Sequence, residues 1–238
     1  MKALVLASSA LSPSCEKRLT ELGFEPIIMP AYQRLQSGVS SHPDMLVFFD
    51  GNKFFCTREY YNEAKFVFSR IEALGYSPVL CDEIPLEDYP NDVIFNALML
   101  GDIVFGLEGS LSLTLKQSLA SYGKKIVNVK QGYTKCSICV VSDNAIITAD
   151  KPIADTCLKI GMDVLLISEG HISLPPYSFG FIGGTSGLYK NDLYFCGSLE
   201  AHPDAEKIKE FCKKHGKTAF SLTNGELQDV GSIFFIGE

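Results

Sequence analysis

The sequence lacks a long apolar segment, a basic cluster and a recognisable export signal. No apolar run approaches the roughly 20 residues of a membrane-spanning helix, so no contact with a membrane is expected. The lysines and arginines are scattered along a chain of net charge −7, a pattern that argues against a nucleic-acid surface. The apolar run near the N-terminus is too short for a signal peptide and leads directly into a charged amphipathic segment. We therefore expect a cytoplasmic globular protein.

The sequence also has little that would hold a metal ion or a cofactor. Its eight cysteines lie mostly inside apolar segments, as is typical of small buried hydrophobic residues. Cys136 and Cys139 form one CxxC pair, but residues three apart on a strand point to opposite faces. No second CxxC pair completes a zinc site. We predict neither a metal nor a cofactor.

What the sequence does contain is a pattern that repeats five times. Each copy has the end of a helix, a glycine and a strand: LTELGFEPIIM, IEALGYSPVL, LASYGKKIVNV, LKIGMDVLLI and KKHGKTAFSL. The glycines, at 23, 75, 123, 161 and 216, would end each helix in the left-handed conformation. Four copies also have an upstream hairpin, with turns at Asp50-Gly51, Gly101-Asp102, Asp143-Asn144 and Lys190-Asn191. The repeating unit is therefore strand, strand, helix, strand.

One copy is divided between the two ends of the chain. Residues 1–30 supply only strand, helix and strand, and the missing first strand is GSIFFIGE, residues 231–238. We predict an α/β protein with a single domain over 1–238: a five-fold pseudosymmetric α/β propeller of ββαβ units, closed by pairing of the N- and C-terminal strands. The units are 231–238 with 1–30, 43–81, 92–129, 136–168 and 181–222. A doubly wound sheet would explain the alternation but not the five glycines or the orphan strand.

Five such units closed by the two termini resemble the pentein fold of guanidino-modifying enzymes, which include arginine deiminases, dimethylarginine hydrolases and amidinotransferases. The fold also has a non-catalytic branch, the ribosome anti-association factor. The segments HPDM, NDVIFNAL, QGYTKCS, GFIGGTSG and QDVGSIFF are similar to an uncharacterised bacterial family of this fold. The resemblance implies that the first strand of each unit lines the central axis.

The loops that enter these first strands would then converge at one mouth. Their polar residues are candidates for binding a small-molecule ligand, because pockets usually combine a concave shape with a few convergent polar groups. Asp92 and Asp229 each precede a valine, and either bind a cationic ligand or accept backbone N–H groups. The complete ligand-binding set is Asp44, Asp92, Asn96, Gln131, Tyr133, Lys135, Gly183, Gly184, Thr185, Asp229 and Ser232.

The catalytic cysteine of the guanidino enzymes lies at the entry to the last inner strand, with a histidine before it. In this sequence, Phe234 and Phe235 stand at the corresponding positions. Cys136 is the alternative nucleophile, with Lys135 beside it to lower its pKa. The other interpretation of Cys136 is an inert, buried residue.

His42 is the candidate acid or base. It belongs to His42-Pro43-Asp44, which comes directly before an inner strand with no helix to cap, so the segment either contributes to the pocket or anchors the loop. The same three residue types at His202-Pro203-Asp204 precede a helical pattern and are expected to begin that helix.

Two functions remain open. The first is an enzyme that acts on a guanidino or other small cationic compound by cysteine nucleophilic catalysis, as a hydrolase or transferase. The alternative is a non-catalytic propeller that binds a ligand or a partner, because Phe235 occupies the usual position of the catalytic cysteine. The net negative charge of the chain argues against a ribosomal role, since contacts with rRNA are made mainly by lysine and arginine.

Overall fold

The computed structural model describes residues 2–237 and follows the order of the predicted units. The divided unit contains β1 (Leu4–Ser8), α1 (Pro13–Glu21), β2 (Glu25–Met29) and β15 (Phe234–Ile236). The second unit contains α2 (Pro43–Leu46), β3 (Phe48–Phe49), β4 (Lys53–Thr57), α3 (Arg58–Glu63), α4 (Lys65–Glu72) and β5 (Ser77–Cys81). The third contains β6 (Leu98–Leu100), β7 (Ile103–Gly106), α5 (Leu113–Ser121) and β8 (Lys125–Asn128).

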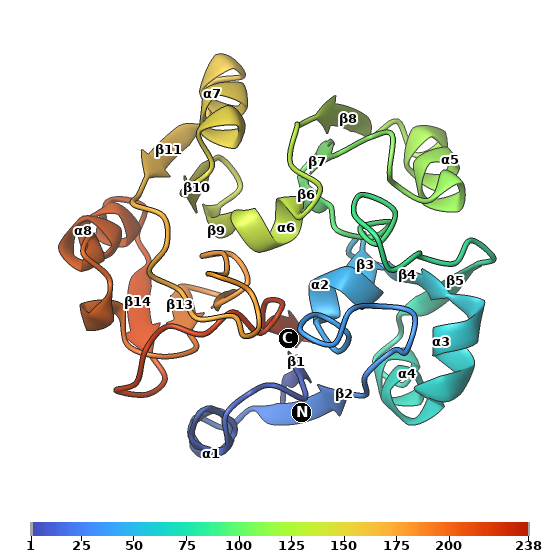
Figure 1. Ribbon diagram of the computed structural model, residues 1–238, viewed down its shortest axis with the longest axis horizontal. Helices are drawn as coiled ribbons and strands as arrows, with labels where there is room; N and C mark the ends of the chain where they lie inside the picture. The colour runs from blue at the N-terminus through green and yellow to red at the C-terminus, as the bar shows by residue number, and fades with distance from the viewer. Residues whose placement is uncertain (1, 238) are drawn as a thin grey trace.

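The last two units have the same plan. The fourth contains α6 (Thr134–Ser137), β9 (Cys139–Ser142), β10 (Ala145–Thr148), α7 (Lys151–Lys159) and β11 (Asp163–Leu166). The fifth contains β12 (Ser186–Tyr189), β13 (Asp192–Phe195), the 3₁₀ turn η1 (Leu199–Ala201), α8 (Ala205–Lys214) and β14 (Thr218–Ser221). The sheets surround a common centre, with the longer helices outside and α2 and α6 near the middle (Figure 1).

Each unit is a three-stranded sheet in which an antiparallel pair of strands is extended by a parallel third strand, and in four units the antiparallel pair is a hairpin. The turns between the hairpin strands fall at the four predicted positions. The five helix-ending glycines all have positive φ, from 68° at Gly216 to 94° at Gly75, so the repeat seen in the sequence is confirmed. This conformation is costly for other residues, which explains why glycine recurs there.

The predicted pairing of the two ends of the chain is present. β15 runs antiparallel to β1, with Leu4 opposite Ile236 and Val5 opposite Phe235. β1 also pairs in parallel with β2, so β15 completes the sheet of the divided unit. The inner strand β12 packs against both β15 and β9, which places first strands of neighbouring units side by side.

The hydrophobic core is divided among clusters that join neighbouring units. In one of them, Phe48 and Phe55 of the second unit pack with Val104 and Leu115 of the third. The eight cysteines are all buried free thiols, as the sequence predicted. Among residues 2–237, no helix is long and apolar enough to cross a membrane.

Two short helices differ from the expectation of loops. Pro43 begins α2, so His42 directly precedes a helix and the prediction of no helix there was wrong. The fixed φ of proline suits a first helical position, as it does elsewhere in the protein. The segment TKCS forms α6, whose first N–H groups are held by a partner distant in sequence: the Asn96 Oδ1 atom accepts from Lys135 N at 2.7 Å and from Cys136 N at 3.4 Å.

We predict that deleting residues 231–238 strongly destabilises the protein. The deletion removes β15 and the buried side chains of Ile233 and Ile236, each worth about 1.5–3 kcal/mol, out of a typical total stability of about 5–15 kcal/mol. Chemical denaturation should show a large loss or no folded state. The control is Phe66→Ser on α4, where the side chain is 60% exposed. A truncated chain as stable as the full chain would contradict this role of the terminal pairing.

Candidate functional site

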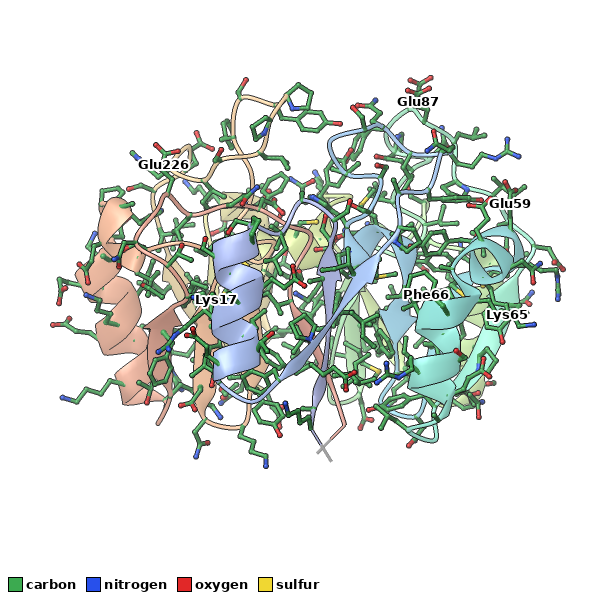
Figure 2. All side chains as sticks on the ribbon, turned by 90° about the horizontal axis from the view of Figure 1, so that it is seen from below. Lys17, Glu59, Lys65, Phe66, Glu87 and Glu226 are labelled. Atoms are coloured by element: carbon green, nitrogen blue, oxygen red, sulfur yellow. The ribbon has the colours of Figure 1, made fainter. Side chains whose placement is uncertain are left out.

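The site lies on the face of the molecule where the long loops gather, which is the upper face in Figure 2. A cavity of about 290 Å³, here called the main cavity, opens among these loops. Three of its lining side chains, those of His42, Cys136 and Asp229, come from segments that lead into the first strands of three different units. Its other walls are largely apolar and aromatic, formed by Val39, Tyr133, Leu174, Tyr177, Ser178, Phe179 and Phe181.

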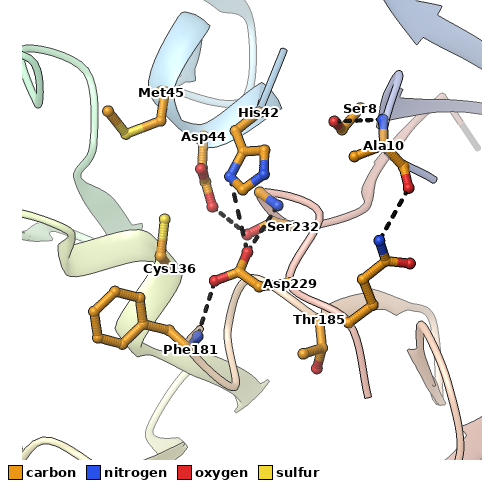
Figure 3. Close-up of polar contacts among 12 residues, drawn as sticks. Ser8, Ala10, His42, Asp44, Met45, Cys136, Phe181, Thr185, Asp229 and Ser232 are labelled. Atoms are coloured by element: carbon orange, nitrogen blue, oxygen red, sulfur yellow. Dashed lines mark hydrogen bonds and ion pairs between the residues drawn. The ribbon is translucent and has the colours of Figure 1, made fainter. Parts of the chain in front are cut away.

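Asp229 is fixed by the backbone of two loops. Its Oδ1 atom accepts from Gly231 N at 2.9 Å and its Oδ2 atom accepts from Phe181 N at 2.8 Å (Figure 3). The side chain is almost fully buried. Burial raises the pKa of Asp229 to about 6, although the two N–H groups and Lys135 act in the opposite direction. Asp229 therefore presents to the cavity a carboxyl group that loses its proton at a higher pH than an ordinary aspartate does.

His42 lies against Asp229 without a hydrogen bond. Its Nδ1 atom is 3.8 Å from Asp229 Oδ1, which is beyond hydrogen-bond distance (Figure 3). Among the described residues, neither ring nitrogen has a hydrogen-bond partner, although the side chain is only 1% exposed. Burial lowers the pKa of His42, so the neutral ring is favoured. Unpaired buried nitrogens are costly and mark a place where a ligand can bind.

Asp44 lies directly behind this pair and is bound to Ser232. The Ser232 Oγ atom is 2.7 Å from Asp44 Oδ2, 3.0 Å from Gly183 O and 2.9 Å from Lys135 Nζ. The Ser232 hydroxyl accepts from Lys135 Nζ and donates its one proton to Asp44 Oδ2 or to Gly183 O. Burial raises the pKa of Asp44, whereas the nearby His42 and Lys135 and the hydrogen bond from Ser232 act in the opposite direction. The Asp44 Oδ1 atom has no partner among the described residues.

Cys136 is held by Asn96. The Asn96 Nδ2 group donates to Cys136 Sγ at 3.1 Å and contacts Met45 Sδ at 3.3 Å, while its Oδ1 atom holds the start of α6. Burial is the main reason why the pKa of Cys136 lies well above its ordinary value, and the charges of Asp44 and Asp229 raise it further. Burial and the two aspartates therefore outweigh the lowering of the Cys136 pKa that was expected from the adjacent Lys135. Without a ligand the thiol is neutral.

Asp92 supports the aromatic wall of the main cavity. Its Oδ2 atom accepts from the Tyr133 hydroxyl at 2.6 Å, and burial raises the pKa of Asp92. The Tyr133 ring stacks between Tyr89 and Phe181, at centroid distances of 5.4 and 6.0 Å. Asp92 therefore acts on the cavity through Tyr133.

Four other predicted residues have different surroundings. The backbone of Gly183 is so close to the carbonyl groups of α6 and Ile138 that a side chain would overlap with them, and a side chain on Gly184 would overlap with Asp229. These glycines allow two units to approach each other closely. The Thr185 hydroxyl donates to Ile182 O within its own turn. Gln131 lines a second cavity and donates to Asp150.

The sequence analysis placed candidates only at the ends of two loops, and it missed the earlier residues of these loops that form much of the cavity. Val39 belongs to the loop after β2, whereas Leu174, Tyr177, Phe179 and Phe181 come from the loop between β11 and β12. The available signal was the aromatic run YSFGF in a segment without a strand pattern. The sequence analysis considered only the residues directly before the first strand of each unit. The long loops that connect one unit to the next also line the cavity, so their residues were missed.

Comparison with known proteins identifies the family. The model of the family described as "Family of unknown function (DUF6873)" matches residues 6–234. The chain belongs to this family. No curated protein matches the sequence.

Solved structures share the fold of this DUF6873 protein. DDAH from Pseudomonas aeruginosa, a mutant in complex with citrulline, has a TM-score of 0.54 at 11% identity, covering 93% of this chain and 92% of that chain. The agmatine deiminase of C. jejuni has a TM-score of 0.56 at 11% identity, covering 100% and 82%. The N-terminal domain of ArgZ, a cyanobacterial arginine dihydrolase bound to product, gives 0.55 at 12%, covering 100% and 98%. The DUF6873 protein therefore has the pentein fold of guanidino-modifying enzymes.

We predict that Asp229 makes the DUF6873 protein less stable as the pH rises from about 4 to about 6. Its folded-state pKa is raised from 3.8 to about 6, so the folded state holds the proton more tightly than the unfolded state. This stabilisation is complete below the unfolded-state pKa of 3.8 and is lost as the pH rises through the folded-state pKa of about 6. At 1.36 kcal/mol per pKa unit, the free energy of unfolding falls by up to about 3 kcal/mol.

Denaturant titrations at several pH values measure this contribution. Asp229→Asn should flatten the fall in stability between pH 4 and 6, whatever its effect on absolute stability. The control is Asp143→Asn, an exposed turn residue between β9 and β10, which should keep the wild-type slope. Equal slopes in wild type and Asp229→Asn would contradict the raised pKa.

Proposed function

We propose that this DUF6873 protein binds a guanidinium or another small cationic group in the main cavity, and that Cys136 attacks its carbon atom as a nucleophile. One observation carries the proposal. Cys136, His42 and Asp229 meet at one cavity, and both nitrogens of His42 and one oxygen of Asp44 are buried without partners among the described residues. A planar group with several N–H donors would provide a partner for the Asp44 oxygen and for the acceptor nitrogen of the neutral His42 ring.

The charge distribution of the site favours a cation. Asp229 lines the main cavity and Asp44 lies directly behind it, whereas the lowered pKa of His42 leaves its ring uncharged. Lys135, the cation beside the two aspartates, is engaged with Ser232. The aromatic rings of Tyr133 and Phe181 line the same cavity and can pack against the face of a planar cation.

The same cation would activate the thiol. Asp44 and Asp229 raise the pKa of Cys136 in the free protein. A cation bound between them would offset their negative charge and lower the pKa of the thiol, which favours the thiolate. The neutral ring of His42 suits the transfer of a proton, because it can accept one from the thiol and donate it to a departing nitrogen. The substrate thereby takes part in generating its own nucleophile.

The proposed reaction has two steps. In the first, a bond forms between Cys136 Sγ and the guanidinium carbon, a carbon–nitrogen bond breaks, and the thiol proton moves through His42 to the departing nitrogen. In the second, water attacks the same carbon, the carbon–sulfur bond breaks and the thiol is restored. The products of hydrolysis are a urea and an ammonium ion. In a transfer reaction, an amine replaces the water.

A second candidate, a non-catalytic binding protein, is supported by the last inner strand. Phe235 packs against Phe24, Tyr189 and Tyr194 at centroid distances of 4.8, 5.3 and 5.4 Å. The position that holds cysteine in the resembling enzymes is thus part of an aromatic core. In this second function, the cavity would bind the cation and Cys136 would remain a neutral thiol.

Two reagents of similar shape distinguish the candidates. Chloroacetamidine is a cation and chloroacetamide is neutral, and each alkylates a thiol with loss of chloride. If Cys136 is a substrate-activated nucleophile, the amidine should modify it at least about tenfold faster than the amide, as expected for one charged hydrogen bond. Asp44→Asn should reduce the difference, because it removes a carboxylate without changing the size of the side chain.

Peptide mapping by mass spectrometry under native conditions identifies the modified cysteine. Cys15 is the internal control, since hydrogen bonding with Cys196 helps lower the pKa of Cys15 to about 6 and no cation is needed to activate it. Cys15 should therefore show no preference for the amidine. Equal rates of both reagents at Cys136, or no modification there, would reject nucleophilic catalysis and leave the binding function.

A further inference from the structure

A second cavity of about 240 Å³, here called the side cavity, adjoins the main cavity. The two share the side chains of Phe179 and Phe181 as a common wall. Consecutive residues of α6 also face the two spaces: Cys136 lines the main cavity and Ser137 the side cavity. Because the two cavities share this wall, a short alkyl chain that crosses it would connect groups bound on its two sides.

The polar groups of the side cavity are suited to an ammonium ion. Ser137 is only 2% exposed, and its Oγ atom has no hydrogen-bond partner among the described residues. Asp150 and Glu169 add carboxylates, one half-buried and one exposed at the rim. Asp150 uses Oδ1 to cap α7 and accepts from Gln131 through Oδ2 at 3.2 Å, which leaves lone pairs for another donor. An ammonium group needs several acceptors of this kind.

The same walls are poorly suited to a carboxylate. Within residues 2–237, neither cavity is lined by a lysine or an arginine. The nearby Lys135 side chain donates to Ser232, which is itself bound to Asp44. A carboxylate in the side cavity would therefore face Asp150 and Glu169 without a cation to balance it, which is unfavourable.

We propose that the ligand is a guanidine whose alkyl chain ends in an amine and carries no carboxylate, with its amine in the side cavity against Ser137, Asp150 and Glu169. The inference rests on the proposed function for the position of the guanidinium group. It narrows the substrate class from guanidino compounds in general to dications, and it excludes α-amino acids. The alkyl chain crosses the wall at Phe179, whose side chain is 38% exposed.

Calorimetric titration with three related guanidines tests the proposal. Aminobutylguanidine has the amine, butylguanidine lacks it, and arginine adds a carboxylate beside it. Aminobutylguanidine should bind about tenfold more tightly than butylguanidine, the value of one charged hydrogen bond. Arginine should bind more weakly than both. The combined variant Ser137→Ala with Glu169→Gln should abolish the advantage of aminobutylguanidine over butylguanidine, measured as the ratio of the two affinities in the same variant.

Glu87→Gln is the matched control. Glu87 is an exposed acid on the same face (Figure 2) but lines neither cavity, so its removal should leave the preference intact. If butylguanidine binds but the amine adds nothing, or arginine binds as tightly, the inference is overturned while the proposed function stands. If none of the three guanidines binds, both are overturned.

Discussion

The candidate site depends on the pairing of β15 with β1. Residues 229–233 lead directly into β15, so this pairing fixes the segment that carries Asp229 and Ser232. Gly231 O then accepts from Asp44 N at 3.1 Å, and Ser232 binds the Asp44 side chain. The two ends of the chain thus meet at the polar groups of the cavity, which ties the stability of the fold to the geometry of the site.

The site is kept in an electrostatically unfavourable state. Two carboxyl groups, a histidine and a thiol are buried together, and burial favours the neutral form of each. The backbone N–H groups on Asp229 offset part of that cost. Such arrangements are typical of functional sites, because a bound ion recovers the interactions that the free protein lacks. A cation fits this role, since it would favour the ionised forms of both aspartates and of Cys136.

The position of the cysteine separates this protein from the enzymes that it resembles. Phe234 and Phe235 belong to the aromatic packing around the last inner strand. The ring centroids of Phe234 and Phe49 are 5.7 Å apart, and Phe235 packs against Phe24. Cys136 instead enters from α6 of the fourth unit and reaches a cavity shared with His42. Because the fold is pseudosymmetric, corresponding loops from different units face the same centre, so side chains from several units reach one cavity.

The sequence by itself determined the five units, since glycine at a helix end and Gly/Asn/Asp turns act locally through backbone sterics. It also determined that the strand in GSIFFIGE pairs with the first strand, because an apolar strand must be paired and buried and the first unit is the one that lacks a strand. It identified His42, Cys136 and Asp229 as candidates, but not how they act. Only the tertiary structure decided that Gly184 makes room for Asp229 rather than for a ligand, that Asn96 holds Cys136, and that the loop with Phe181 forms the wall. These relations join residues from different units, and the pKa of each buried group depends on neighbours that no local pattern specifies.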